Sequence, residues 1–351
     1  MEFLDERTVD LVKTSTLAHG VRQRQPLARL REAADAVDHS AYHDRDGREI
    51  DTSRQFVCPS ATPLYYTPIY NDLTDQQRLR YNQLCGLSFN ELVTLFESQF
   101  AQRVLAAVRN DAERAGDEPL LDCVQQFIEE EEHHAQAWQR LCKLSDPVRY
   151  ADTTYAITRP SPFGLRLMCF IAARPQRFPA ILWVMLALEE KALNVARRCL
   201  HMPRHELEPT YREMYTQHAH DEARHVQLDW HFIERYYDRL TPSRRRRTAW
   251  LVAKLLGQIF LRPARAAIRV VECWLREFPE LQSRKREIES QLAALVESKD
   301  YHEMMYSRRT TPILFSLFDR YPEMRRMEHV LLCYEANTTE DGEGFLNRRP
   351  R

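Results

Sequence analysis

The sequence predicts an all-α protein, a four-helix bundle with additional N- and C-terminal helices. The chain has 351 residues but only eight glycines. Apolar residues recur at helical spacing over long stretches, and no segment shows the apolar-polar alternation of a strand. The motifs G-x-G-x-x-G and G-x-x-x-x-G-K-S/T do not occur in the sequence, which disfavours nucleotide-binding folds that hold phosphates on glycine-rich loops.

Residues 1–72 are predicted to form an N-terminal helix and an extended arm that pack on the bundle. Basic and apolar residues alternate at helical spacing over residues 9–37. One glycine and three prolines then interrupt residues 43–72, which is typical of an extended segment.

Residues 73–240 are predicted to form the bundle itself. Its four helices are expected at Thr74–Arg114, Leu120–Lys143, Pro179–Leu200 and His205–Leu240, each followed by a Gly or Pro break. The stretch between the second and third helices is expected to be irregular, because it contains Asp146-Pro147 and Pro160-Ser161-Pro162.

Residues 241–336 are predicted to add helices that wall the bundle and a substrate pocket. Helical patterns cover 244–277 and 280–299, and shorter ones continue to about residue 335. Residues 337–351 form a polar tail that is predicted to be disordered. The whole chain is expected to form one globular domain.

Composition excludes several classes of partner. Fifty Lys and Arg nearly balance 51 Asp and Glu, so the sequence lacks the overall positive charge of a nucleic-acid-binding protein. Its most apolar stretch, Ala180–Leu188, is far short of the ~20 residues that cross a bilayer. The N-terminus has no apolar core of a secretory signal, and the eight cysteines form no C-x-x-C motif. We therefore expect a cytoplasmic protein with reduced thiols that binds neither nucleic acid nor membranes.

One local run of charge stands apart from this balance. Ser243 is followed by four arginines, Arg244–Arg247. The plainer interpretation is a solvated helix start, and the alternative is a docking site for an acidic partner.

Two of the predicted bundle helices carry an acid and a histidine three residues apart. They are Glu131-x-x-His134 in the second helix and Glu222-x-x-His225 in the fourth. Residues i and i+3 share one helix face, so both side chains of a pair can point into the bundle core. An isolated pair of this kind is usually a solvated acid beside a surface histidine, and only the joint pattern is informative.

The other two bundle helices each carry a glutamate on an apolar stripe, where a carboxylate is not expected. Glu97 lies in line with apolar residues of the first helix, and Glu189 lies in line with those of the third. Glu190 leans towards the polar side of its helix and is the alternative to Glu189. In the second helix, Glu131 is the glutamate that lies in line with the apolar residues, and its two neighbouring glutamates are the alternatives.

The spacing of these residues predicts a metal centre. Glu97 precedes Glu131 by 34 residues, and Glu189 precedes Glu222 by 33, which indicates two equivalent helical hairpins. Two lone glutamates and two E-x-x-H pairs in one bundle core are the arrangement of di-iron and di-manganese carboxylate proteins. Four carboxylates buried without cations would cost several kcal/mol each, and two divalent ions would neutralise them. Carboxylates and imidazoles favour iron or manganese over softer metals.

Further acids stand directly before the two pairs, Glu130 before Glu131 and Asp221 before Glu222. A ligating histidine usually donates its other ring N–H to a carboxylate. We therefore expect Asp221 to hold His134 across the bundle and Glu130 to hold His225, with Arg224 tying the two acids together.

A third histidine completes the pattern of the fourth helix. His218 stands four residues before Glu222 and seven before His225, so that H-x-x-x-E-x-x-H presents three candidate ligands on one face. With this histidine, the sequence resembles the para-aminobenzoate N-oxygenase family of ferritin-like di-iron oxygenases over roughly residues 85–240. The resemblance implies a ferritin-like bundle with seven metal ligands, namely Glu97, Glu131, His134, Glu189, His218, Glu222 and His225.

The resemblance also implies a function. The protein would be a di-iron, O2-dependent N-oxygenase that converts a primary amine to a hydroxylamine, nitroso or nitro product through a peroxo-di-iron intermediate. It would use two iron ions and O2, a small-molecule or carrier-bound amine, and an external electron donor, and it could form a homodimer. The alternatives are a di-iron hydroxylase or desaturase that acts on carbon and a non-catalytic iron-binding protein. No substrate-binding residue is assigned.

Overall fold

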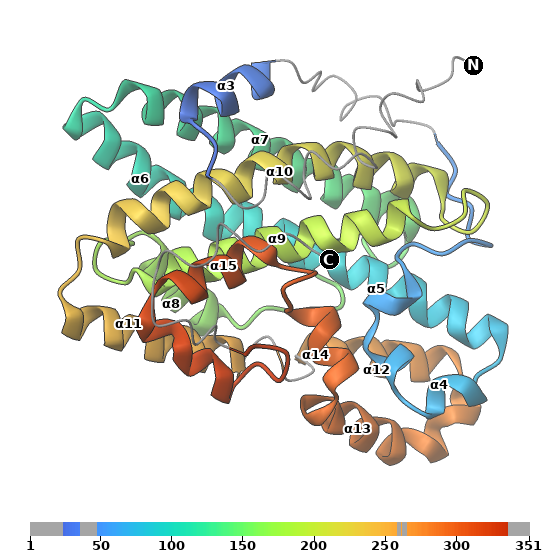
Figure 1. The fold of residues 1–351 in the computed structure, drawn as a ribbon. Coiled ribbons are helices and arrows are strands. Elements are labelled where there is room, and N and C mark those ends of the chain that lie inside the picture. Colours follow the sequence, from blue (N-terminus) through green and yellow to red (C-terminus); the bar gives the residue numbers. More distant parts are fainter. Residues whose placement is uncertain (1–23, 36–47, 258–260, 262–264, 336–351) are drawn as a thin grey trace, which may run out of the picture.

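The bundle dominates the molecule. The computed structural model describes residues 24–35, 48–257, 261 and 265–335. Its four long rods are α5 (Asp75–Leu95) continued by η4 (Phe96–Ala101) and α6 (Gln102–Ala115), then α7 (Glu118–Ser145), α9 (Ala180–Leu200) and α10 (Pro209–Tyr237) (Figure 1). The α5–α6 rod packs on α7, and α9 packs on α10. Among the described residues, extended pairing is limited to one bridge between Gln55 and Leu207. The predicted all-α, ferritin-like fold is confirmed.

Local chemistry sets the ends of the bundle helices. Thr74 and Gln77 form a reciprocal capping box at the start of α5. Gly116 ends α6 with φ 64°, the left-handed conformation that glycine adopts without steric cost. At the start of α10, the Glu208 side chain accepts the backbone N–H of Tyr211.

None of the described helices is long and apolar enough to cross a membrane.

The first bundle helix differs from expectation in one segment. The sequence predicts an uninterrupted α-helix over Thr74–Arg114, whereas Phe96–Ala101 forms π-helix within the continuous rod. A π-helical turn within an α-helix is rare and is frequently found at functional sites. Glu97, one of the predicted metal ligands, lies in this segment.

The prediction of irregular chain between the second and third bundle helices is wrong for α8 (Pro162–Ala172). Pro162 stands at the first helical position, where the missing N–H costs nothing, and Ser161 caps the helix by accepting the N–H of Gly164. Pro160-Ser161-Pro162 is therefore a helix start rather than a break.

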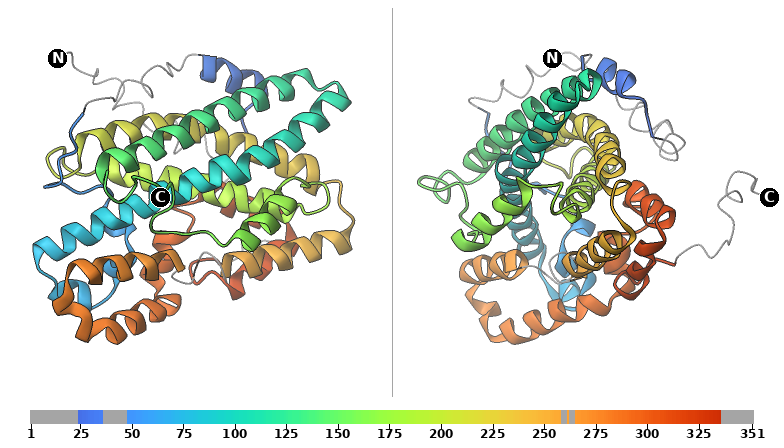
Figure 2. Two further views of the ribbon diagram at one scale, coloured as in Figure 1. Left: turned by 180° about the vertical axis from the view of Figure 1, so that it is seen from behind. Right: turned by 90° about the vertical axis from the view of Figure 1, so that its left-hand side faces the viewer.

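The C-terminal helices are shorter than predicted. Residues 244–277 form two helices instead of one, with Gly257 and Pro263 in the interval, and residues 280–299 are partly 3-10 helix. The elements are α11 (Pro242–Leu255), α12 (Arg265–Glu277), η6 (Pro279–Arg284), α13 (Lys285–Ala294), η7 (Leu295–Glu297), α14 (Lys299–Met305), α15 (Pro312–Arg320) and η8 (Pro322–His329). They lie along the side of the bundle opposite α3, as the further views show (Figure 2). α11 and α15 pack on α9, and α12 packs on α5.

The N-terminal elements are only partly described. Of the helix predicted over residues 9–37, the structure describes α3 (Leu27–Asp35), which packs on α7 and α10. Residues 24–26 of that segment are not helical, whereas residues 9–23 and 36–37 and the predicted disordered tail, 337–351, lie outside the described residues. The arm contains η2 (Pro59–Ala61), η3 (Pro63–Tyr66) and α4 (Ile69–Asp72).

The arm packs tightly against the bundle. The Phe56 ring stacks on Tyr211 with 4.4 Å between ring centroids, and the Phe56 backbone N–H donates to Asn82. Gly86 of α5 faces this contact, since a Cβ placed there would lie 2.6 Å from the Phe56 Cβ. Gly86 is therefore required for close approach of the arm.

We predict that Gly86→Ala lowers the free energy of unfolding by about 1–3 kcal/mol, because the added methyl displaces Phe56 from its stack. Gly164→Ala in α8 is the matched control, since its Cβ would meet nothing closer than 3.6 Å. That control should leave stability unchanged or raise it by up to ~1 kcal/mol through helix propensity. Urea denaturation of both variants tests the prediction, and equal effects would contradict it.

Candidate metal centre

The bundle core contains a cluster of carboxylates and imidazoles. None of the seven predicted ligands is more than 2 % exposed, and they are Glu97, Glu131, His134, Glu189, His218, Glu222 and His225. Glu97 comes from η4, Glu131 and His134 from α7, Glu189 from α9, and the other three from α10. All four rods of the bundle thus contribute to one buried site.

Six of the seven fall into two overlapping groups that could each hold a metal ion. The groups are Glu97, His134, His218 and Glu222, and Glu131, His134, Glu222 and His225. Within each group the candidate ligand atoms lie within 4.8 Å of one another. Glu189 is outside both groups, but it lies close enough to Glu222 for its charge to add to burial in raising the pKa of Glu222.

Two carboxylates fix the histidines of the E-x-x-H pairs. Asp221 Oδ2 lies 2.9 Å from His134 Nε2, and Glu130 Oε2 lies 2.8 Å from His225 Nε2. These contacts leave the Nδ1 atoms of both rings facing the cluster, with His225 Nδ1 3.2 Å from Glu131 Oε1. The structure therefore brings together the two pairs expected from the sequence and orients each imidazole towards the core.

Arg224 joins the two supporting carboxylates. Its Nη2 donates to Glu130 Oε1 and to Asp221 Oδ1, each at 2.6 Å. Burial alone would raise the pKa of Asp221, but the hydrogen bond from His134 and the charge of Arg224 outweigh it and lower that pKa. The pKa of Glu130 is lowered in the same way, against its own burial, by His225 and Arg224.

His218 enters the cluster through its other ring nitrogen. Its Nε2 lies 3.1 Å from Glu97 Oε1 and 3.1 Å from Glu222 Oε1. The edge of its ring packs against Trp138, with 5.2 Å between centroids. His218 thus lies between acids of two different helices instead of filling an apolar core position.

The donor set fits divalent metal. Both carboxylate oxygens of Glu131 and of Glu222 are buried without a hydrogen-bond partner, as are one oxygen of Glu97 and one of Glu189. Unsatisfied buried carboxylate oxygens are costly and rare in folded proteins. Cations coordinated by these oxygens would remove that cost.

Two other buried glutamates, unlike those of the cluster, are satisfied by backbone N–H groups. Glu91 is equally buried, but its oxygens accept the backbone N–H groups of Ala156, Ile157 and Thr158. Glu190 accepts the N–H groups of Ile313 and Leu314 at the start of α15. Glu190, the sequence alternative to Glu189, is therefore committed to a helix N-terminus, while Glu189 faces the cluster.

The inner carboxyls differ in acidity from the supporting acids. Burial, followed by repulsion from Glu189, raises the pKa values of Glu97, Glu131 and Glu222 well above the usual range. Without metal, these groups therefore hold protons that a bound cation would displace.

A comparison with protein families identifies the family of the chain. The model of the family described as P-aminobenzoate N-oxygenase AurF matches residues 22–306, which is most of the chain. The chain belongs to the AurF family. The resemblance indicated by the H-x-x-x-E-x-x-H pattern is thereby confirmed. AurF is a family of di-iron N-oxygenases, so the chain is an enzyme, a non-haem oxidoreductase of a metalloenzyme family. No curated protein matches the chain.

One buried acid beside the AurF-family site was missed by the sequence analysis. Asp229 of α10 is 1 % exposed, and neither of its carboxylate oxygens has a hydrogen-bond partner. Burial, followed by the charges of Glu189 and Glu190, raises its pKa. The sequence does contain a signal for Asp229, because positions 218, 222, 225 and 229 lie on one helix face at spacings of four, three and four residues.

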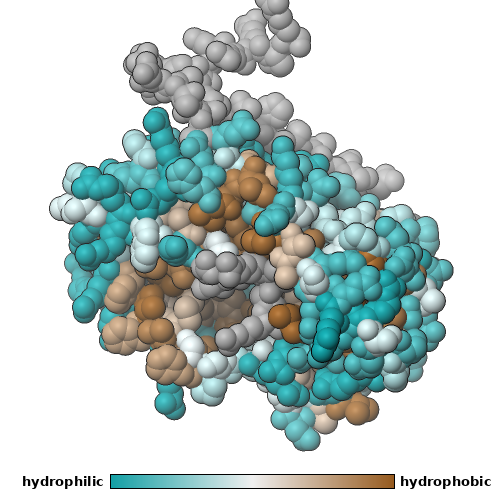
Figure 3. All heavy atoms as spheres, turned by 90° about the horizontal axis from the view of Figure 1, so that it is seen from below, coloured by the Kyte–Doolittle hydropathy of each residue, from teal (hydrophilic) through white to brown (hydrophobic). Residues whose placement is uncertain are grey.

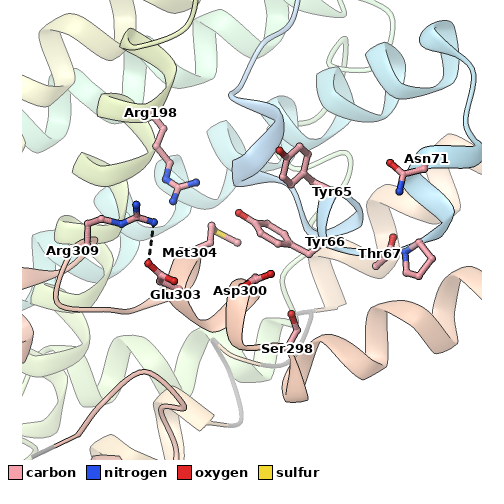
Figure 4. Close-up of a pocket in the computed structure, with 11 residues that line it drawn as sticks. Tyr65, Tyr66, Thr67, Asn71, Arg198, Ser298, Asp300, Glu303, Met304 and Arg309 are labelled. Carbon is pink, nitrogen blue, oxygen red and sulfur yellow. Dashed lines mark ion pairs between the residues drawn. The ribbon is translucent and has the colours of Figure 1, made fainter.

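A cavity at the surface of the molecule lies away from the cluster. It measures about 680 Å³ and is bounded by the arm, the end of α9 and α14 (Figure 4). Both arginines that line it have partners, since Arg309 pairs with Glu303 at 3.1 Å and Arg198 donates to Ser60. Arg198 is nine residues beyond Glu189, about 13 Å along the helix. None of the seven cluster residues lines this cavity.

We predict that the metal-free enzyme loses stability as the pH rises above about 4.5, the ordinary pKa of its cluster glutamates. Because their pKa values are raised by folding, the folded chain keeps protons that the unfolded chain has released, so ionisation favours unfolding. Calorimetry in chelator should show Tm falling as the pH is raised from about 5 towards neutrality.

Glu131→Gln should flatten this pH dependence, because it removes one raised pKa from the cluster. Glu132→Gln is the control, since Glu132 is the exposed neighbour on the same helix. An identical slope of Tm against pH in Glu131→Gln and in the control would contradict the assignment.

Proposed function

We propose that this enzyme uses two iron ions and O2 to oxidise the nitrogen of a primary amine to a hydroxylamine, nitroso or nitro product. Family membership supports the reaction class. The observation that supports it most directly in this chain is His218, which adds a third imidazole to the usual set of carboxylates and E-x-x-H histidines.

The two overlapping groups, with Glu189 beside Glu222, would hold the two ions. Bound iron would supply the electrons and the coordination positions that activate O2. Conversion of an amine to a hydroxylamine consumes one O2, two electrons and two protons, and releases one water. One oxygen atom enters the product and the other leaves in that water.

The chain's own residues would set the geometry and charge of the centre. Asp221 accepts a hydrogen bond from the Nε2–H of His134, and Glu130 accepts one from the Nε2–H of His225. Each imidazole therefore keeps its proton on Nε2 and presents the lone pair of Nδ1 to the cluster. Phe127 stacks on His225 at 3.7 Å between centroids, which fixes that ring and excludes water. Four inner carboxylates would neutralise two divalent ions, so the loaded site is nearly uncharged in its buried setting.

The ligand assignment predicts opposite outcomes at two adjacent residues. Glu189→Ala should reduce bound iron clearly below two per chain, because it removes a carboxylate that faces the cluster. Glu190→Ala should keep the iron content, but it should lower the free energy of unfolding by about 1–3 kcal/mol, because two buried N–H groups of α15 lose their acceptor. Elemental analysis together with denaturation tests this pair, and the reverse pattern would exchange the two roles.

The reaction itself is tested by turnover. Reduced, iron-loaded protein is exposed to 18O2 with simple arylamines and, separately, with hydrocarbon substrates, and the products are analysed by mass spectrometry. We expect 18O in hydroxylamine, nitroso or nitro products. Products with 18O on carbon, or with a new double bond and no nitrogen oxidation, would instead indicate a hydroxylase or desaturase. Stoichiometric iron binding without any product would indicate a non-catalytic iron protein.

A further inference from the structure

α8 is an apolar helix that lies largely in solvent. Of its eleven residues only Ala172 is buried. Phe163 is 77 % exposed, and Leu167 and Phe170 are each 48 % exposed. Their spacing of four and three residues places them on one helix face. A stripe of this kind normally faces a protein core or a partner.

The surroundings of this stripe are strongly basic. Residues 153–188 and 239–271 contain thirteen Arg and Lys and no Asp or Glu, in a chain of net charge −1. Twelve of the thirteen are arginines. Although the net charge of the chain is close to zero, every charged Asp, Glu, Lys or Arg side chain in these two segments is positive.

The two basic segments meet on one surface. Arg244 of α11 donates to the backbone oxygen of Gln176, just beyond α8, and the Arg174 guanidinium lies 4.0 Å from the Phe170 ring centroid. Trp250 of α11 is 51 % exposed. Figure 3 shows apolar side chains gathered on the left of the view, the side on which α8 and α11 lie in Figure 1. We call the exposed side chains of α8, Arg174, Arg177 and α11 the α8–α11 face.

The inner side of α8 lies against the segment that bears a candidate metal ligand. α8 packs on η4, and Cys169 Sγ lies 3.8 Å from the backbone oxygen of Gln99. Gln99 is two residues from Glu97 in the same π-helical segment. The exposed stripe of α8 is thus separated from the segment that bears Glu97 by the thickness of one helix, and α11 continues the face beside it.

From these observations we propose that the α8–α11 face docks an acidic electron-transfer protein that reduces the metal centre. The inference rests on the proposed function, which consumes two electrons for each oxygen atom inserted into an amine. Two one-electron transfers from docked donor molecules supply those electrons, and two ferric ions accept one each to become ferrous while two donor molecules are oxidised. Electron transfer slows steeply with distance, so the donor must dock close to a ligand-bearing helix.

The composition of the face favours a protein partner. Arginine and aromatic residues are enriched in protein interfaces, where a guanidinium pairs with carboxylates in a two-pronged geometry. Complementary charge also speeds the encounter of short-lived redox complexes, which bury little area. An anionic membrane would use the same charge and apolar residues, but it would not require their position over Glu97.

The test compares charge reversal on this face with charge reversal elsewhere. The variant Arg246→Glu/Arg247→Glu changes two exposed residues of α11. The matched control, Lys285→Glu/Arg286→Glu, makes the same charge change on α13, at the other end of the molecule (Figure 1). A third variant, Phe163→Ser, removes apolar area without changing charge.

The probe is a reduced, acidic [2Fe–2S] ferredoxin, and stopped-flow absorbance follows its oxidation by the iron-loaded protein. The second-order rate constant should fall at least about tenfold in Arg246→Glu/Arg247→Glu, and less than about twofold in the α13 control. It should also fall in Phe163→Ser, and the wild-type constant should decrease as salt is added. Reduction by dithionite, which needs no docking, should be the same in all four proteins.

Equal ferredoxin rates in the α11 variant and its control would overturn the proposal. Two other results would also overturn it. In one, the wild-type protein binds phosphatidylserine vesicles and the α11 variant does not, while the two proteins oxidise ferredoxin at the same rate. In the other, the wild-type protein forms a dimer and the α11 variant does not, again with equal ferredoxin rates. A docking failure is distinguishable from a failure of the proposed function. In the first case, dithionite-reduced protein still oxidises amines, and in the second, ferredoxin reduces the iron but no amine is oxidised.

Discussion

The architecture depends on the burial of several carboxylates in one core without backbone donors to satisfy them. Glu131 and Glu222 have no hydrogen-bond partner on either oxygen, although both are fully buried. Protons or cations must offset this burial, and because cations bind only to the folded cluster, folding and metal binding are linked. The bundle supplies the apolar walls that make the carboxylates bind metal instead of water. The positively charged Arg224 remains outside the cluster, on the supporting acids, where it does not compete with a metal.

The sequence predicts the bundle and most of the cluster because both follow from helical periodicity. A carboxylate on an apolar stripe is visible without a structure, which is how Glu97 and Glu189 were chosen. The cross-bundle pairs of His134 with Asp221 and of His225 with Glu130 follow from the antiparallel arrangement of α7 and α10. In each case, the relevant signal lies within one helix or between two helices of predictable direction.

Other features depend on tertiary contacts that one sequence does not reveal. The π-helical segment around Glu97 has no marker in its composition, and α8 was obscured by prolines that begin a helix as readily as they interrupt one. The choice between Glu189 and Glu190 became clear only with α15 in place, because its N–H groups occupy Glu190. Asp229 continues the helix face of His218, Glu222 and His225, but it lies outside the H-x-x-x-E-x-x-H pattern, and its burial depends on the packing of α9.

The attachment of Glu190 to α15 ties the C-terminal region to the helix that bears Glu189. Adjacent residues on an α-helix point about 100° apart, so Glu189 and Glu190 serve two separate environments from one turn of α9. A shift of α15 would therefore pull on the same turn of α9 that carries Glu189. The position of this inner carboxyl thus depends on a segment more than 120 residues away in the chain.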